Sequence, residues 1–368
     1  MNTKHKQQYL LLQALRAYAA FLVIYEHLFG SFIDLIIKEP NIYSEFISNY
    51  IFSPLGIVDH GGGLGVVQFF ILSGFVITMV GMRESRFEFA VKRFLRILPP
   101  IFFALVVIAM LYWVLYFFNM TSFINIHSAQ WPSLVSWNDF NLISFLKNLF
   151  LVNVNMNMVM WTLRIEIIFY ILIFFSLPLI KKTPVKFYVI VCLIYIVGYV
   201  LNMLPNYYFG NYGELYSKVY GQFEYVIFLF LGSLFYLWYD NKIRLTSFIV
   251  LNGIFLILVW ENGLSRYIFL SYILIVFSVY LNNKIEVNKL LQYFGNISYS
   301  TYLNHQTIGT ILISILISEF GYSSNNFLFF FITILLLILF ISSVSFKYIE
   351  QPSQQFARKL IKKVQSAK

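Results

Sequence analysis

Two side chains in the first apolar stretch of the chain could do polar chemistry inside a membrane. Arg16 and His27 are eleven residues apart, so on an α-helix they would lie on one face, about 16 Å apart along the axis. A guanidinium group binds anions and an imidazole transfers protons near neutral pH. The pair could therefore hold an anion at one end of a cavity along the helix and transfer protons at the other end. A snorkelling arginine and a hydrogen-bonded interfacial histidine would explain the same positions.

A carboxylate occurs near the start of a later apolar stretch. The sequence Trp161-Thr-Leu-Arg164-Ile-Glu166 places Glu166 about one to two helical turns into the membrane, where a charged group is costly and usually functional. Its partner could be Arg164 or the imidazole of His27. A structural ion pair is the alternative interpretation.

A second imidazole occurs near the C-terminus. Ser298, Tyr302 and His305 would share one face of a helix and so place an imidazole beside a phenol. Polar side chains in this arrangement could also serve only to hold helices together.

Paired arginines follow the second apolar stretch. The segment 83–97 carries Arg93 and Arg96, which are three residues apart and would point the same way on a helix. Two guanidinium groups could bind phosphates through paired hydrogen bonds. A topology determinant that contacts anionic lipid is the alternative.

The second apolar stretch contains small residues. Gly65, Ser73 and Gly74 would allow another helix to approach closely. No Lys-Ser or Lys-Thr follows these glycines, which excludes a phosphate-binding loop of the Walker type.

These residues are embedded in a strongly apolar chain. Of its 368 residues, 60% are hydrophobic, 20% aromatic and only 11% charged, with a mean hydropathy of +0.74, whereas soluble domains have about 25% charged residues. The apolar blocks are about 16 to 22 residues long, which matches roughly 30 Å of hydrocarbon, and they lack the alternation of barrel strands. The composition therefore predicts an all-α polytopic membrane bundle, and we expect it to lie in the inner (plasma) membrane.

About ten transmembrane helices are expected. Their predicted ranges are 9–30, 63–82, 98–118, 161–180, 186–203, 223–239, 246–260, 267–281, 295–317 and 327–346. Most Lys and Arg residues then lie on the side of the N-terminus, which places both termini in the cytoplasm by the positive-inside rule. Because Arg16 and Glu26 interrupt the first apolar stretch, we interpret it as a retained helix and not as a signal peptide.

The predicted domain organisation is simple. Residues 1–350 would form one integral-membrane domain, and residues 351–368 a basic cytoplasmic tail. Within the outer segment 119–160, residues 153–158 alternate polar and apolar side chains. We expect them to fold against the bundle or to re-enter it and line a cavity.

The charge and the cysteine count exclude other classes. The net charge of +10 follows the membrane topology, which argues against nucleic-acid binding. Cys192 is the single cysteine, so no internal disulfide can form, and no Cys/His spacing predicts a metal site.

Taken together, the motifs resemble the acyltransferase-3 family of integral membrane acyltransferases, which includes bacterial O-acetyltransferases of polysaccharides, lipopolysaccharides and Nod factors. The resemblance spans about Leu15 to Pro352. In chain order, the motifs are Arg16-x10-His27, Phe69-Phe-Ile-Leu-Ser-Gly-Phe75, Arg93-x-x-Arg96-Ile-Leu-Pro99, Trp161-Thr-Leu-x-Ile-Glu166, Ser298-Tyr-x-x-Tyr302-Leu-x-His305 and Glu350-x-Pro352. The chain departs from the family pattern at Arg164, at Glu26 before the key histidine, and at Gln306-Thr307, where a proline often follows the later histidine.

The resemblance implies transfer of an acyl group, usually acetyl, from cytoplasmic acyl-CoA (acetyl-CoA) to a hydroxyl of a cell-surface polysaccharide or a lipid-linked sugar. His27 would act as general base or carry the acyl group itself, and Glu166 would orient an imidazole. Tyr302 or Arg16 would stabilise the oxyanion. His305 would complete the catalytic group.

The resemblance also implies binding residues and partners. The donor would be held by Arg16, Arg93 and Arg96, with Ser73 as a further donor contact, and Trp161 would stack on a sugar. Some relatives carry an extracytoplasmic domain that completes the transfer, so a separate acyl-accepting protein could be a partner. No metal is implied.

Two other functions remain compatible with the sequence. In a transporter or flippase for a glycan or an anion, Arg16, Glu166 and His305 would line the translocation path. A succinyl donor, with Arg164 near its free carboxylate, is the other alternative.

Overall fold

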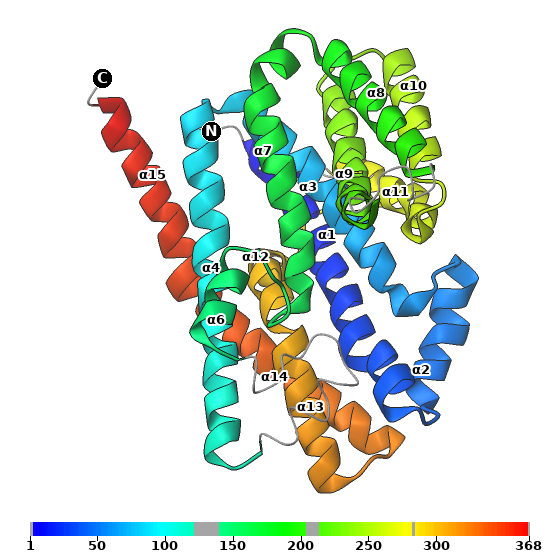
Figure 1. Ribbon diagram of the computed structural model, residues 1–368, viewed down its shortest axis with the longest axis vertical. Coiled ribbons are helices and arrows are strands. Elements are labelled where there is room, and N and C mark those ends of the chain that lie inside the picture. The colour runs from blue at the N-terminus through cyan, green and yellow to red at the C-terminus, as the bar shows by residue number, and fades with distance from the viewer. Residues whose placement is uncertain (1–2, 121–139, 204–212, 282–283, 367–368) are drawn as a thin grey trace. The chain divides into compact units, whose positions relative to one another are not determined.

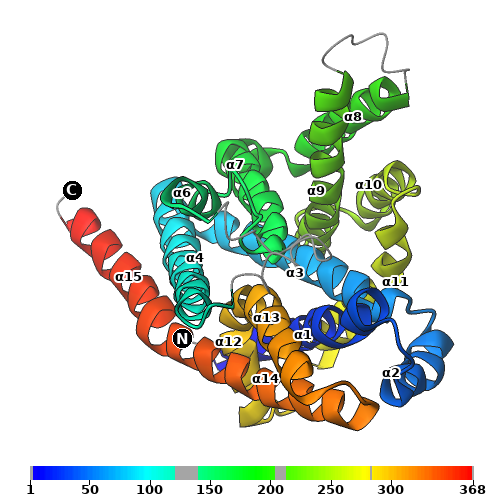
Figure 2. The same cartoon turned by 60° about the horizontal axis from the view of Figure 1, so that its bottom comes forward.

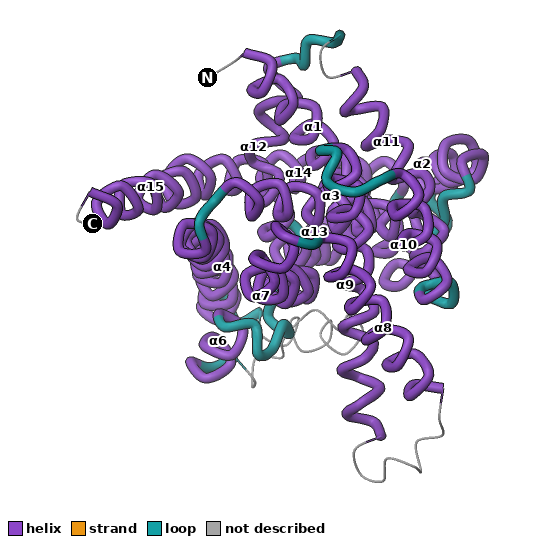
Figure 3. Tube along the Cα trace, turned by 90° about the horizontal axis from the view of Figure 1, so that it is seen from above, coloured by secondary structure: helices purple, strands orange, loops and turns teal. Residues whose placement is uncertain are grey.

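The computed structural model describes residues 3–120, 140–203, 213–281 and 284–366, which are helical with no strand among them (Figure 1). Figure 3 shows helices joined by short connections throughout the described ranges. Among these described residues, eight helical segments are long and apolar enough to cross a membrane, and two shorter apolar helices span Leu245–Leu258 and Gln306–Phe320. The all-helical prediction is confirmed. The number of spans and the side of the termini stay predictions.

The chain packs into two compact units. The first comprises Met1–Val66, Val91–Leu163 and Val276–Lys368. Its helices, some of which extend past its limits, are α1 (Thr3–Tyr25), α2 (Ile42–Ile47), α4 (Arg86–Phe117), α6 (Leu142–Leu149), α12 (Lys289–Asn304), α13 (Gln306–Phe320), α14 (Ser324–Ser345) and α15 (Gln351–Ser366). In Figures 1 and 2, α12 and α13 lie beside α1.

The second unit comprises Val67–Ala90 and Arg164–Ile275. Its helices are α3 (Gly62–Arg83), α7 (Trp161–Lys182), α8 (Pro184–Met203), α9 (Gly213–Tyr239), α10 (Leu245–Leu258) and α11 (Ile268–Leu281). A Cβ atom at Gly74 would collide with the carbonyl of Leu229, and one at Gly232 with the carbonyl of Ile71. The prediction that Gly74 permits close helix packing is therefore confirmed.

Two glycines set the distance between α1 and the pair α12–α13 in the first unit. A Cβ atom at Gly295 would lie 2.6 Å from the carbonyl oxygen of Gln13, and one at Gly309 would lie 2.6 Å from Cδ1 of Leu28. Both distances are below van der Waals contact. The contact at Gly295 is with backbone atoms and could not be relieved by rotating a side chain, so only glycine permits the close approach there. The contacts also show that α1 runs parallel to α12–α13.

Turns of π-helix interrupt two of the long helices of the first unit. η1 (Glu26–Gly30) continues α1, and η10 (Phe346–Glu350) joins α14 to α15. Turns of this kind are rare and often mark functional positions. Here one carries His27 and the other carries Glu350.

The helices differ from the predicted ranges at three places. α4 begins at Arg86, before the predicted span 98–118, and contains Pro99 and Pro100. The predicted span 295–317 is divided at His305 into α12 and α13. Residues 351–366 of the predicted tail form α15, since a proline in the first turn of a helix costs little.

Candidate active site

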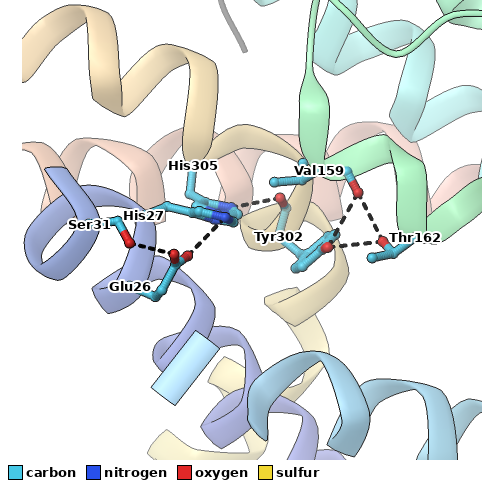
Figure 4. Close-up of polar contacts among 7 residues, drawn as sticks. All are labelled: Glu26, His27, Ser31, Val159, Thr162, Tyr302 and His305. Carbon is cyan, nitrogen blue, oxygen red and sulfur yellow. Dashed lines mark hydrogen bonds and ion pairs between the residues drawn. The ribbon is translucent and has the colours of Figure 1, made fainter. Parts of the chain in front are cut away.

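The two predicted imidazoles lie together in the first unit. Nδ1 of His27 is 3.0 Å from Nε2 of His305, and the rings stack at 5.2 Å between centroids (Figure 4). His305 is completely buried, whereas the His27 side chain is 22% exposed. A ligand can therefore reach His27 while His305 stays shielded from solvent.

A carboxylate holds the other nitrogen of His27. Nε2 of His27 is 2.9 Å from Oε2 of Glu26, and Ser31 Oγ donates a hydrogen bond of 2.7 Å to Oε1 of the same carboxylate (Figure 4). Gly62 makes room for this side chain, because a Cβ atom there would lie 2.5 Å from Cγ of Glu26. Glu26 is thus fixed against the imidazole.

The hydrogen bonds define the tautomers. Nδ1 of His305 is 2.7 Å from the carbonyl oxygen of Tyr302, and a carbonyl can only accept, so this nitrogen carries the hydrogen. Nε2 of neutral His305 is then an acceptor for the N–H at Nδ1 of His27. The remaining nitrogen, Nε2 of His27, faces Glu26 and bears the lone pair whenever His27 is neutral.

The three contacts together require three hydrogens, one in each. Two neutral imidazoles supply two of them. The third resides on His27 as an imidazolium facing a carboxylate, or on Glu26 as a carboxylic acid. Either arrangement leaves His305, His27 and Glu26 with no net charge, which suits a site of low dielectric constant.

The contact between His305 and Tyr302 lies at the break between α12 and α13. The imidazole of His305 is bound to the carbonyl of Tyr302, three residues earlier, and side chains that bind local backbone in this way compete with the helix.

The Tyr302 hydroxyl points to the start of α7. It lies 2.9 Å from Thr162 Oγ1 and 3.3 Å from the carbonyl of Val159 (Figure 4). Tyr302 therefore contacts His305 through its backbone carbonyl, while its phenol is engaged with Thr162. Its role as an oxyanion donor stays a prediction.

The segment before α7 packs against the broken helix. Asn157 is fully buried and donates from Nδ2 to the carbonyl of Leu303 at 2.7 Å, and Thr307 Oγ1 donates to the carbonyl of Met156 at 3.0 Å. Within the predicted segment 153–158, Met156 and Asn157 thus pack against the broken helix, whereas re-entry into the membrane stays a prediction. Residues 121–139 of the predicted outer segment 119–160 lie outside the described residues.

A polar cavity of about 240 Å³ occupies the other end of α1. Its lining comes from α1, α4, α12, η10 and α15. It includes the cations Arg16, Arg96 and Arg358, the acid Glu350, and the amides Gln13, Asn296, Gln351, Gln354 and Gln355. Three guanidinium groups against one carboxylate suit a ligand with several negative charges.

Glu350 is the buried acid of this cavity. Ser300 Oγ donates to its Oε2 and Gln354 Nε2 to its Oε1, both at 3.1 Å. Its carboxylate also interacts electrostatically with Arg96 and Arg16. The cavity's two deeper arginines therefore lie in the field of a carboxylate that is itself held in place.

The other predicted site residues lie elsewhere. Glu166, in the second unit, accepts a hydrogen bond of 2.5 Å from the Tyr170 hydroxyl within α7. Ser73 is buried in α3 of the same unit. The roles of both stay predictions.

Arg93 and Trp161 belong to the first unit but not to the lining of the cavity. Arg93 lies on α4 and is partly buried, and Arg96 of the same helix does line the cavity. Trp161 is half-buried at the first position of α7, next to Thr162. The donor role of Arg93 and the sugar-binding role of Trp161 stay predictions.

Sequence reasoning did not assign a role to Glu26 or Arg358. Neighbouring residues on an α-helix do not face each other, so the adjacency of Glu26 and His27 gave no reason to pair them. Arg358 is one of several basic residues in a short tail. Its spacing from Gln351, Gln354 and Gln355, which places all four on one face of a helix, was the available signal.

The comparisons with known proteins point to one family. A family model for an acyltransferase domain, that of acyltransferase-3, matches residues 10–346. No curated protein and no solved structure matches the chain significantly. The matched region includes Arg16, His27 and His305 and ends before Glu350 and Arg358.

Proposed function

Since this chain belongs to the acyltransferase-3 family, we propose that it transfers an acetyl group from cytoplasmic acetyl-CoA to a hydroxyl of a cell-surface polysaccharide or a lipid-linked sugar. Its family and its apolar helices make it a multi-pass membrane acyltransferase. One observation carries the finer proposal. The helix α1 and its continuation η1 connect the arginine-lined cavity, at Arg16, with the imidazole pair, at His27.

The cavity is the proposed donor site. Arg16 and Arg96 would bind the diphosphate of CoA, because guanidinium groups bind phosphate oxygens in pairs. The pantetheine arm would then extend along α1 towards His27. The predicted placement of both termini in the cytoplasm puts the mouth of this cavity on the side where acyl-CoA is made.

His27 is the proposed base. With His305 Nδ1 bound to a carbonyl and His27 Nδ1 bound to His305, the lone pair of neutral His27 is at Nε2. This nitrogen removes the proton of the acceptor hydroxyl as the hydroxyl oxygen attacks the thioester carbonyl carbon. The C–S bond then breaks, and the proton passes from His27 to the departing thiolate of CoA.

Glu26 supports this step through charge. The base form requires that the third hydrogen of the cluster first leaves the contact between Nε2 and Glu26 to solvent, so that His27 is neutral and Glu26 is a carboxylate. This carboxylate lies 2.9 Å from Nε2 and stabilises the imidazolium that forms during the transfer. The acceptor hydroxyl must share Nε2 with Glu26 or displace it. His305 is a positioning residue in this scheme, because it fixes the tautomer of His27 without touching the substrate.

The decisive test compares wild type with His27→Ala and His305→Ala at matched membrane expression. Ester-linked acyl groups are measured on the cell-surface glycan, and CoA binding is measured on the purified protein. We expect both variants to lose at least about 100-fold in acylation, because a positioned base contributes on this order, and to keep wild-type affinity for CoA.

Each other outcome rejects a stated part of the proposal. Normal acylation by His27→Ala would exclude the mechanism. If the wild-type protein neither binds CoA nor acylates the glycan, the enzyme interpretation would be rejected in favour of a glycan or anion transporter. A covalent acyl group recovered on His27 after rapid quenching would make this residue a carrier and not a base, and faster transfer from succinyl-CoA than from acetyl-CoA would change the donor.

A further inference from the structure

The C-terminal helix α15 contributes one wall of the polar cavity. Gln351, Gln354, Gln355 and Arg358 line it, and these positions recur at helical spacing, so that they form one face of α15. The match to the family model ends at Phe346, so these four residues lie outside the matched region.

The cavity has a deep end and a mouth. Glu350 is 2% exposed, and Arg16 and Arg96 are partly buried beside it, whereas Arg358 is exposed. A ligand whose reactive end extends inward along α1 would thus meet Arg358 with its outermost part.

The charges of the two ends differ as well. At the deep end the carboxylate of Glu350 interacts with both Arg96 and Arg16, which leaves one net positive charge among three groups. Arg358 adds a second cation at the mouth. The deep end alone is therefore poorly matched to a ligand that carries both a diphosphate and a further phosphate.

We infer that Arg358 binds the 3′-phosphate of the donor's ribose and so makes the site selective for CoA over donors that lack this group. The inference rests on the proposed function. In CoA the diphosphate lies between the pantetheine arm and the adenosine, and the 3′-phosphate lies beyond it. The order of cations from Arg16 and Arg96 to Arg358 matches this order of phosphates, and a guanidinium group is well suited to a phosphate monoester.

The test measures equilibrium binding of CoA and of 3′-dephospho-CoA to the full-length protein in nanodiscs of neutral lipid. Neutral lipid prevents anionic headgroups from competing for the basic face of α15. The variants are Arg358→Gln and Arg358→Lys, and the control is Lys363→Gln. Lys363 lies on the same helix, carries the same charge and does not line the cavity.

Wild type should bind CoA about tenfold more tightly than 3′-dephospho-CoA, the effect of one charge-assisted contact. Arg358→Gln should weaken CoA binding about tenfold and leave 3′-dephospho-CoA binding unchanged, so that the preference disappears. Arg358→Lys should retain part of the preference because it keeps the charge but not the paired hydrogen bonds. Lys363→Gln should behave as wild type.

Two results would overturn the inference while the proposed function stands. In the first, Arg358→Gln retains the full preference for CoA. In the second, Arg358→Gln lowers the affinity for both ligands equally, which would mean that Arg358 acts through general charge or through the fold of α15. If wild type binds neither ligand, the donor site itself is wrong and both proposals fail.

Discussion

The imidazole of His27 is held by the carboxylate of Glu26, its own neighbour in the sequence, at 2.9 Å. Consecutive residues of an α-helix point in different directions, but these two lie in the π-helical turn η1. Ser31, from the following turn, binds the second oxygen of the carboxylate. The turn and the residue that follows it therefore supply the acid, the base and the hydroxyl of this contact from residues within six positions of each other.

Replacement of Glu26 by Gln should lower the rate of acyl transfer without changing donor binding. The amide can still hydrogen-bond to Nε2 of His27, but it cannot stabilise an imidazolium by charge. We expect kcat to fall about 10- to 100-fold, since the variant removes one interaction of the transition state. Steady-state kinetics with acetyl-CoA would show this as a change in kcat at constant KM for the donor.

The control for this variant is Glu45→Gln, which removes an exposed carboxylate from α2 and should leave kcat unchanged. An equal loss in both variants would indicate that net charge matters and not the contact with His27. An unchanged kcat in Glu26→Gln would reject the role given to this carboxylate.

The two arginines of α4 should differ in their effect on CoA binding. Arg96 lines the cavity and interacts with Glu350, whereas Arg93 is not part of the lining. Arg96→Gln should weaken CoA binding about tenfold or more, because a charge-assisted contact to phosphate is lost. Arg93→Gln should weaken it by less than about threefold, which is below the loss of one such contact.

Titration of CoA at several salt concentrations would show which arginine contacts phosphate, since loss of a phosphate contact also reduces the dependence of affinity on salt. Equal and large losses for both variants would favour the sequence-based interpretation, in which the two arginines bind phosphate together.

Replacement of Gly295 by Ala should force α1 and α12 apart. The added Cβ would lie 2.6 Å from a backbone oxygen of α1, and a backbone contact cannot be relieved by rotating a side chain. We expect a loss of about 1–3 kcal/mol, typical of overpacking, together with reduced transfer activity because His27 and His305 are carried by these two helices.

Cys192 offers a direct measurement of this effect. It is the chain's single cysteine and is buried, so a thiol-reactive dye should report thermal unfolding. Gly253→Ala is the control, because nothing lies within 4 Å of the added Cβ and alanine is the better helix former. A melting temperature of Gly295→Ala at or above that of wild type would contradict the proposed packing.

The sequence determined the class of the protein. Its apolar blocks predict an all-helical membrane protein, because only helices and closed barrels satisfy backbone hydrogen bonds in lipid. The ordered motifs from Arg16 to His305 identified the family, which the family model confirms for residues 10–346. The expectation that the alternating segment 153–158 folds against the bundle agrees with the buried Asn157, which donates a hydrogen bond to the carbonyl of Leu303.

The composition of the site was decided by the tertiary structure. The contact between His27 and His305 joins residues 278 positions apart, and no spacing rule reaches that far. It depends on the close approach of α1 to α12 and α13 at Gly295 and Gly309. A glycine in an apolar stretch does not reveal which helix it will meet.

Two local features of the backbone could not be predicted from the sequence either. Helical arithmetic assumes 100° per residue, and the π-helical turns at Glu26–Gly30 and Phe346–Glu350 change the direction in which Glu26 and Glu350 point. At His305 the helix breaks and the side chain binds a local backbone carbonyl, whereas the apolar pattern runs on without interruption. The sequence thus supplied the reacting groups, and the packing of helices decided which of them meet.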